Sequence, residues 1–197
     1  MKFTLRLFLL LCFTVTRLAA QDENINTDRP DQSDGVYTLT KKYFQVEEGI
    51  TLGKNLFTNN LMIRYGLTTS TEIRLLSDAG KIDDWKGFLP FTLSVKQKII
   101  KQKKWIPAIT AVGYMSYGKI ASKDFLTNKI SYELKLAFEN EVNENFTVSY
   151  NAGFTDDFKT FNYTFNLGYS PIQKISLCAE YFASVNSCVQ HNPDAGV

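Results

Sequence analysis

The most regular stretch of the chain is residues 160–170, where hydrophobic and polar side chains alternate without a break. Its apolar positions are almost all aromatic: Phe161, Tyr163, Phe165, Leu167 and Tyr169. The positions between them hold only Asn, Thr, Gly and Ser. A period of two predicts a β-strand with one apolar and one polar face. The stretch is about twice the roughly 5–6 residues of a typical strand and matches the ~9–11 residues that a tilted strand needs to cross a bilayer.

The same alternation recurs along the chain and predicts nine strands and no convincing helix. The strands are expected at residues 44–52, 61–65, 72–75, 89–96, 109–117, 129–139, 146–155, 160–170 and 175–181. Glu48 falls in the apolar phase of the first strand, and Val112 and Tyr114 blur the phase of the fifth. The pattern favours an all-β fold, an antiparallel up-and-down transmembrane β-barrel.

The predicted links between the strands alternate in length. Short polar links are expected at residues 66–70, 101–104, 143–145 and 171–174. The links at the other end tend to be longer, at 53–60, 77–87, 118–128 and 184–190, with 156–159 as a short exception. Outer-membrane barrels have short periplasmic turns and longer outer loops. The first strand is therefore expected to rise from the periplasm.

Aromatic residues of the apolar phase gather near both ends of the predicted strands. Those beside the short turns are Tyr65, Trp105, Phe146 and Tyr169, and those near the opposite ends are Tyr117, Phe154, Phe161 and Tyr181. Two such girdles are typical of barrels in lipid. A soluble exported barrel or sandwich also alternates, with its apolar face inside, and is the alternative. The strand length, the small polar residues and the aromatic ends favour the membrane.

Residues 1–20 have the organisation of a cleaved signal peptide. Lys2 and Arg6 precede a short apolar run, and small residues end at Ala20. A buried core helix is the alternative for this run. Leu11, before Cys12, is not the small residue of a lipoprotein signal, so no lipid anchor is expected. We expect export to the bacterial outer membrane, with residues 21–41 as a periplasmic segment and 42–197 as the barrel.

Charged residues in the polar phase would face the inside of this barrel, its lumen. They are Glu47, Arg64, Glu72, Arg74, Lys96, Lys98, Glu133, Lys135, Glu139 and Glu180. Opposite charges on neighbouring strands could pair and plug the lumen, or they could line a path or binding site for a small solute. The whole chain is nearly neutral, with 22 basic and 20 acidic residues, which gives no sign of nucleic-acid binding.

The chain offers little for catalysis or metal binding. Its one histidine is His191, with Asp194 three residues later and no evident nucleophile beside it. One histidine and the two thiols left after signal removal, Cys178 and Cys188, do not make a metal-ligand set. No catalytic residue, metal or cofactor is predicted, and the protein is not expected to be an enzyme. The two thiols could pair in an oxidising compartment or remain separate.

Several motifs resemble those of one bacterial family. Thr27, Asp28, Arg29, Pro30 and Asp31 precede the first strand and are similar to the "TDRPD" opening of envelope proteins assigned to transport or to the meta-pathway of phenol degradation. Further similar stretches are residues 43–47, 64–68, 72–75 and 191–196. The resemblance implies an outer-membrane barrel that acts as a transporter or channel for a small, hydrophobic or aromatic solute. It also implies contact with outer-membrane lipid and the barrel-assembly machinery. A structural barrel without transport and a membrane-embedded enzyme are the alternatives.

Two further expectations concern the ends of the chain. Asp28, Arg29 and Asp31 could fold into the periplasmic mouth, with Arg29 paired to Glu47 or Glu72. Family members continue past a motif similar to residues 191–196, and bacterial barrels have an even number of strands. The sequence is therefore expected to be truncated by about three strands, from a barrel of roughly twelve. Unpaired edges would cost several kcal/mol per unsatisfied group in lipid.

Overall fold

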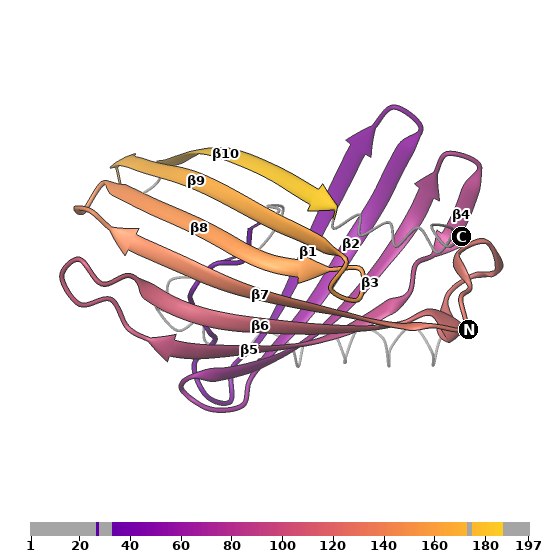
Figure 1. The fold of residues 1–197 in the computed structure, drawn as a ribbon, viewed down its shortest axis with the longest axis horizontal. Helices are drawn as coiled ribbons and strands as arrows, with labels where there is room; N and C mark the ends of the chain where they lie inside the picture. Colours follow the sequence, from indigo (N-terminus) through magenta and orange to yellow (C-terminus); the bar gives the residue numbers. More distant parts are fainter. Residues whose placement is uncertain (1–26, 28–32, 173–174, 187–197) are drawn as a thin grey trace, which may run out of the picture.

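The computed structural model describes residues 27, 33–172 and 175–186, and it shows one antiparallel sheet that curls into a half-barrel (Figure 1). The strands are β1 (Phe44–Gly53), β2 (Leu56–Gly66), β3 (Thr71–Ile82), β4 (Trp85–Phe88), β5 (Phe91–Ile100), β6 (Ala108–Tyr117), β7 (Ile130–Glu141), β8 (Phe146–Thr155), β9 (Thr160–Ile172) and β10 (Ile175–Asn186). Two 3₁₀ turns, η2 (Gly118–Ile120) and η3 (Lys123–Phe125), lie between β6 and β7. The order across the sheet is β1-β2-β3-β5-β6-β7-β8-β9-β10, and β4 pairs with β3 alone.

This arrangement confirms the predicted all-β, antiparallel, up-and-down sheet. Every strand except β4 is 10 to 13 residues long, and each pairs with its neighbour in the chain or, for β3, with β5. The tight links at residues 67–70 and 142–145 and the long link between β6 and β7 are also as predicted. No helix among the described residues is long and apolar enough to pass through a membrane.

Two of the predicted longer links are wrong. Residues 56–60 belong to β2, and residues 77–82 belong to β3, whose end pairs with the unpredicted strand β4. Polar residues such as Asn60 and Asp78 occupy both phases here and hide the alternation, but the backbone ladder between them continues. The hairpins turn at Asn55 and Asp83, which have positive φ values of 59° and 53°. Asn and Asp tolerate this left-handed conformation better than most residues.

Smaller differences concern the ends of β5 and β10. β5 begins at Phe91, after Pro90, whereas the pattern predicted a start at Leu89. β10 continues to Asn186, so the first part of the loop predicted at 184–190 is strand. Tyr181 consequently pairs with Phe165 in the middle of β9, and not near a strand end as predicted.

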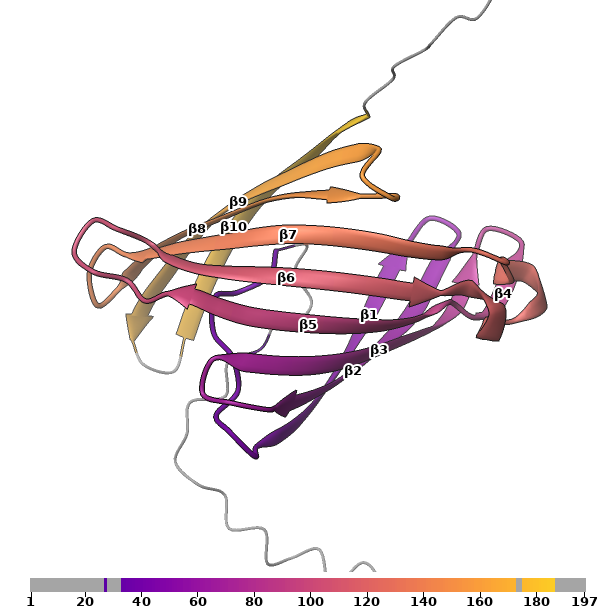
Figure 2. The same cartoon turned by 60° about the horizontal axis from the view of Figure 1, so that its bottom comes forward.

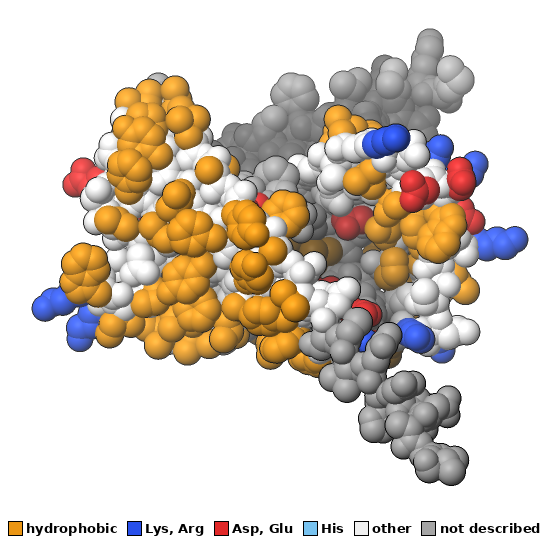
Figure 3. Space-filling view, turned by 45° about the horizontal axis from the view of Figure 1, so that its top comes forward, with side chains coloured by type: hydrophobic (Ala, Val, Ile, Leu, Met, Phe, Trp, Pro, Cys, Tyr) orange, Lys and Arg blue, Asp and Glu red, His pale blue; other side chains and the backbone are white. Residues whose placement is uncertain are grey.

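The two faces of the sheet have opposite polarity, and the apolar face is the exposed one. Along β9, Tyr163, Phe165 and Leu167 are 37–47% exposed, whereas Thr164 and Asn166 are 8–9% exposed. Among the described residues, the buried set holds five hydrophobic side chains and thirteen polar or charged ones. Figure 3 shows hydrophobic side chains spread over the outside of the sheet. The interior of this fold is therefore polar, the reverse of a soluble domain.

The segment before β1 crosses the concave face of the sheet. Figures 1 and 2 show it, in indigo, running inside the curve of the strands. Its residues contact side chains from β3, β6 and β8, among others. The segment leaves the concave face at Gly66, where the Lys42 N–H donates to the Gly66 carbonyl at 2.7 Å. A Cβ atom at Gly66 would lie 2.1 Å from the Thr40 carbonyl oxygen, so this approach requires glycine.

Candidate functional site

The polar concave face is the candidate functional site, and all ten predicted lumen residues lie on it. Six of them are buried: Glu47, Arg64, Glu72, Arg74, Lys96 and Glu139. The other four are partly exposed: Lys98, Glu133, Lys135 and Glu180. They alternate along their strands with the exposed apolar residues, as a period of two requires. The predicted lumen residues that form ion pairs lie in two clusters.

The first cluster joins β1, β2 and β3 through Arg64. Its guanidinium donates to Glu72 through Nε at 2.7 Å and Nη2 at 3.0 Å, and to Glu47 through Nη1 at 2.5 Å. The Leu39 N–H, from the segment before β1, also donates to Glu72, at 2.7 Å. All three charged side chains are at most 4% exposed. The two-point contact with Glu72 fixes the guanidinium plane, and the ion pairs compensate charges that water cannot reach.

The second cluster is centred on Asp34, which sequence reasoning missed. Its carboxylate lies 2.9 Å from Arg74 Nη1, 3.6 Å from Lys135 Nζ, and 2.6 Å from the Tyr114 hydroxyl through either oxygen. These partners come from β3, β7 and β6. Arg74 and Lys135 also each lie 5.1 Å from the centre of the Tyr114 ring. Asp34 therefore stands between two cations that flank one aromatic ring.

The environment of Asp34 keeps it ionised. Burial by itself would raise the pKa of this carboxyl, but the charges of Arg74, Lys135 and Lys96 and the Tyr114 hydrogen bond outweigh it. The net effect holds the pKa of Asp34 well below its ordinary value. Asp34 lies outside every strand, so periodicity could not single it out. One indirect sign of this cluster was present in the sequence. Val112 and Tyr114 interrupt the alternation of the fifth predicted strand, and in the structure both side chains face inward.

The segment from Ser33 to Thr40 has further bonds to the concave face. Asp34 donates its N–H to Asn151 Oδ1 at 2.6 Å and accepts from Asn151 Nδ2 at 3.1 Å. The Val36 carbonyl accepts from the Thr110 hydroxyl at 2.7 Å, and the Tyr37 hydroxyl donates to Glu141 at 2.5 Å. Ser33 contacts Thr164 at 2.7 Å and donates to Glu180. Side chains of the sheet thus serve as hydrogen-bond partners for the segment along most of its length.

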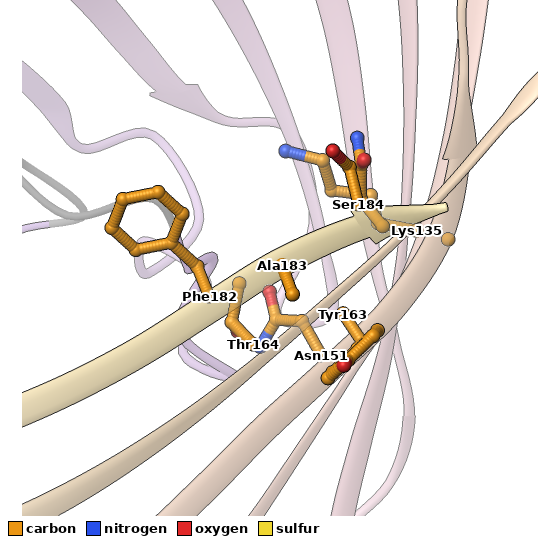
Figure 4. Close-up of a pocket in the computed structure, with 9 residues that line it drawn as sticks. Lys135, Asn151, Tyr163, Thr164, Phe182, Ala183 and Ser184 are labelled. Carbon is orange, nitrogen blue, oxygen red and sulfur yellow. The ribbon is translucent and has the colours of Figure 1, made fainter. Parts of the chain in front are cut away.

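Beside the Asp34 cluster the concave face leaves a cavity of about 370 Å³. Figure 4 shows the residues that line it, which come from β7, β8, β9 and β10. Its polar lining consists of Lys135, Asn151, Asn162, Thr164 and Ser184, and Phe182 adds an aromatic ring. Apart from Lys135 these groups are uncharged. The cavity has the size and the hydrogen-bonding groups to hold a small polar or aromatic molecule.

Some predictions fall outside the described residues. They concern Asp28, Arg29, Pro30, Asp31, Cys188, His191 and Asp194. The two carboxylates predicted as partners of Arg29, Glu47 and Glu72, bind Arg64 in the structure. Within the described residues no group of three or more His, Cys, Asp or Glu side chains is placed to hold a metal ion.

Comparisons with known proteins identify a family. No curated protein and no solved structure gave a match. A family profile matches residues 27–187, which covers most of the 197-residue chain and all the strands of the sheet. The match includes the N-terminal motif and both charged clusters. The chain belongs to the family described as "Putative MetA-pathway of phenol degradation".

Proposed function

We propose that this protein is an outer-membrane β-barrel protein whose polar concave face provides the passage for a small solute. The observation that carries the proposal is the inverted polarity of the sheet. Its exposed convex face is apolar, and its buried concave face holds ion pairs, amides and hydroxyls. A soluble domain would place these faces the other way round. A lipid bilayer outside and a hydrated lumen inside account for both faces.

The strands and their aromatic residues fit the dimensions of a bilayer. Strands of 10 to 13 residues meet the ~9–11 residues that a tilted strand needs to cross the hydrocarbon core. At the tight-turn end, the rings of Phe146 and Tyr169 stack with their centres 4.6 Å apart on the convex side. At the other end, Phe154 and Phe161 lie 5.2 Å apart. We place the tight turns in the periplasm, with lipid and the barrel-assembly machinery as partners.

The nature of the solute is proposed from the cavity and the family. The uncharged amides and hydroxyls between β8 and β10, together with Phe182, suit a small aromatic solute with a few polar groups. The family description associates its members with phenol degradation, which fits such a solute. We propose passage without chemical conversion, since Arg64, Arg74 and Lys135 form ion pairs with carboxylates of the same face.

A structural barrel without transport is the second candidate. It is favoured by the buried ion pairs, which fill the concave face between β1 and β7. If the protein does transport a solute, the ion pairs leave room for a passage only near β8 to β10, where the cavity lies. Only a transport measurement separates these two functions.

The test uses liposomes with two versions of the full chain. One is the wild type, and in the other residues 33–40 are replaced by a Gly-Ser stretch that clears the concave face. Swelling in arabinose reports passage, and heat-modifiable gel mobility reports folding. The proposal expects at least one protein to raise the swelling rate above that of protein-free liposomes. Two folded proteins that both leave the rate unchanged would instead establish a structural barrel.

A further inference from the structure

We propose that residues 33–40, the plug segment, close the lumen, and that the Asp34 side chain is the latch that holds them there. The inference rests on the proposed function, because a plug requires a passage to close. It goes beyond that function by assigning a resting closed state to the barrel and a single residue to its control.

The plug segment is seated across nearly the whole width of the sheet. Ser33 bonds side chains of β9 and β10, Asp34 bonds side chains of β3, β6, β7 and β8, and the residues from Val36 to Leu39 bond side chains of β6, β7 and β3. Asp34 and Val36 are 5% and 3% exposed. A segment that only passed the end of the barrel would not contact both sides of the curved sheet. The segment therefore occupies the space through which a solute would move.

The sheet supplies partners for the backbone of the plug segment. The segment has no strand or helix of its own, so its N–H and C=O groups need other partners. Asn151 bonds both the N–H and the C=O of Asp34, Thr110 bonds the C=O of Val36, and Glu72 bonds the N–H of Leu39. These bonds between the backbone of the segment and side chains of the sheet indicate a specific binding position, the seat of the plug segment.

The attachment is polar, which makes it reversible. Val36 is the one buried hydrophobic residue of the segment, and the other anchors are hydrogen bonds and ion pairs. Water in a lumen can replace such bonds when the segment leaves, whereas an apolar core would hold it by burial. The cavity beside Asn151 and Lys135 adjoins the seat and gives the segment space to move.

Asp34 is the residue on which the seat depends most. Its carboxylate is held by Arg74, Tyr114 and Lys135 at once, and hydrogen bonds between charged groups are the strongest kind available here. Replacing it by Asn keeps the size of the side chain but removes the charge. Arg74 and Lys135, which both lie against the Tyr114 ring, would then lose the carboxylate that they share.

The first experiment measures how often the segment leaves its seat. Val36→Cys, in a background with Cys178→Ser and Cys188→Ser, is labelled in proteoliposomes with a membrane-impermeant maleimide. Adding Asp34→Asn should raise the labelling rate about tenfold or more, because a charge-assisted contact is lost. The matched control is Glu133→Gln, which removes another inward carboxyl near Lys135 and should leave the rate within about twofold. An unchanged rate in Asp34→Asn would overturn the latch.

The second experiment measures closure of the lumen by arabinose swelling of the same liposomes. The plug predicts slow swelling for wild type and Glu133→Gln, and faster swelling for Asp34→Asn and for the Gly-Ser replacement of residues 33–40. Equal swelling by all four would refute the plug and leave the proposed function intact. No swelling by any of them, although all are folded by gel mobility, would refute the proposed function and the plug with it.

Discussion

Arg64 shows how single residues of the concave face depend on one another. Its guanidinium is bonded to both Glu47 and Glu72, and the side chain is 1% exposed. A buried ion pair adds little compared with an apolar pair, but removing one partner leaves the other charge without compensation. Substitutions that remove one partner of a buried ion pair on the concave face should therefore be costly.

Arg64→Met should destabilise the barrel by about 3–5 kcal/mol, because two buried carboxylates lose the guanidinium that pairs with both of them. Urea unfolding in detergent micelles, followed by tryptophan fluorescence, measures the change. Lys81→Met, at an exposed position of β3, is the control and should cost less than about 1 kcal/mol. An Arg64→Met protein as stable as the control would show that the pair of glutamates has other compensation.

The lowered pKa of Asp34 predicts that its contribution to the free energy of unfolding changes only at acidic pH. The groups that face it are Arg74, Lys96, Tyr114 and Lys135, which favour its charged form, and Glu133, which opposes it. A carboxyl whose folded pKa is depressed stabilises the fold above its ordinary value of about 3.8, and loses this contribution as the pH falls towards the lower folded pKa.

The measurement is the difference in unfolding free energy between the wild type and Asp34→Asn at several pH values. It should stay constant from pH 8 to about pH 5 and shrink below about pH 4. A difference that changes between pH 8 and pH 6 would mean that another group controls the segment.

At the scale of elements, the sequence predicted the strands well where the apolar convex face, here called the apolar belt, is continuous. From β5 to β9 one face is apolar for most of each strand, so the alternation and the structure agree closely there. The ends of β2 and β3 extend past the belt, and there only backbone pairing, which leaves no mark on composition, defines the strand. The plug segment could not be predicted either, since its bonds to Thr110, Asn151 and Thr164 join residues far apart in the chain.

The apolar face of β9 makes a prediction that depends on depth. Phe165 lies near the middle of the strand, and Phe161 lies near its end. In a bilayer, Phe165→Arg should cost about 2–4 kcal/mol, whereas Phe161→Arg should cost roughly 0–1 kcal/mol. Unfolding in lipid vesicles compares the two variants directly. Equal costs at both positions would contradict a membrane face.

At the scale of the whole molecule, the polarity of the two faces is the property that unites fold and function. The sheet has an apolar outside, a charged and hydroxylated inside, and a polar segment seated in its curve. The family to which the chain belongs is described as "Putative MetA-pathway of phenol degradation". Ion pairs occupy the concave face between β1 and β7, and the cavity lies beside the seated segment between β7 and β10.

The most direct test of the account is a nitroxide scan of residues 161–169 in the full chain reconstituted into lipid vesicles. Spin-label relaxation is measured with oxygen, which partitions into lipid, and with a water-soluble nickel chelate. The account predicts a period of two, with the labels at Phe161, Tyr163, Phe165, Leu167 and Tyr169 accessible to oxygen and those between them shielded from it. Preferential access of the nickel chelate to the odd-numbered positions would show that the apolar face is in water and would contradict the account.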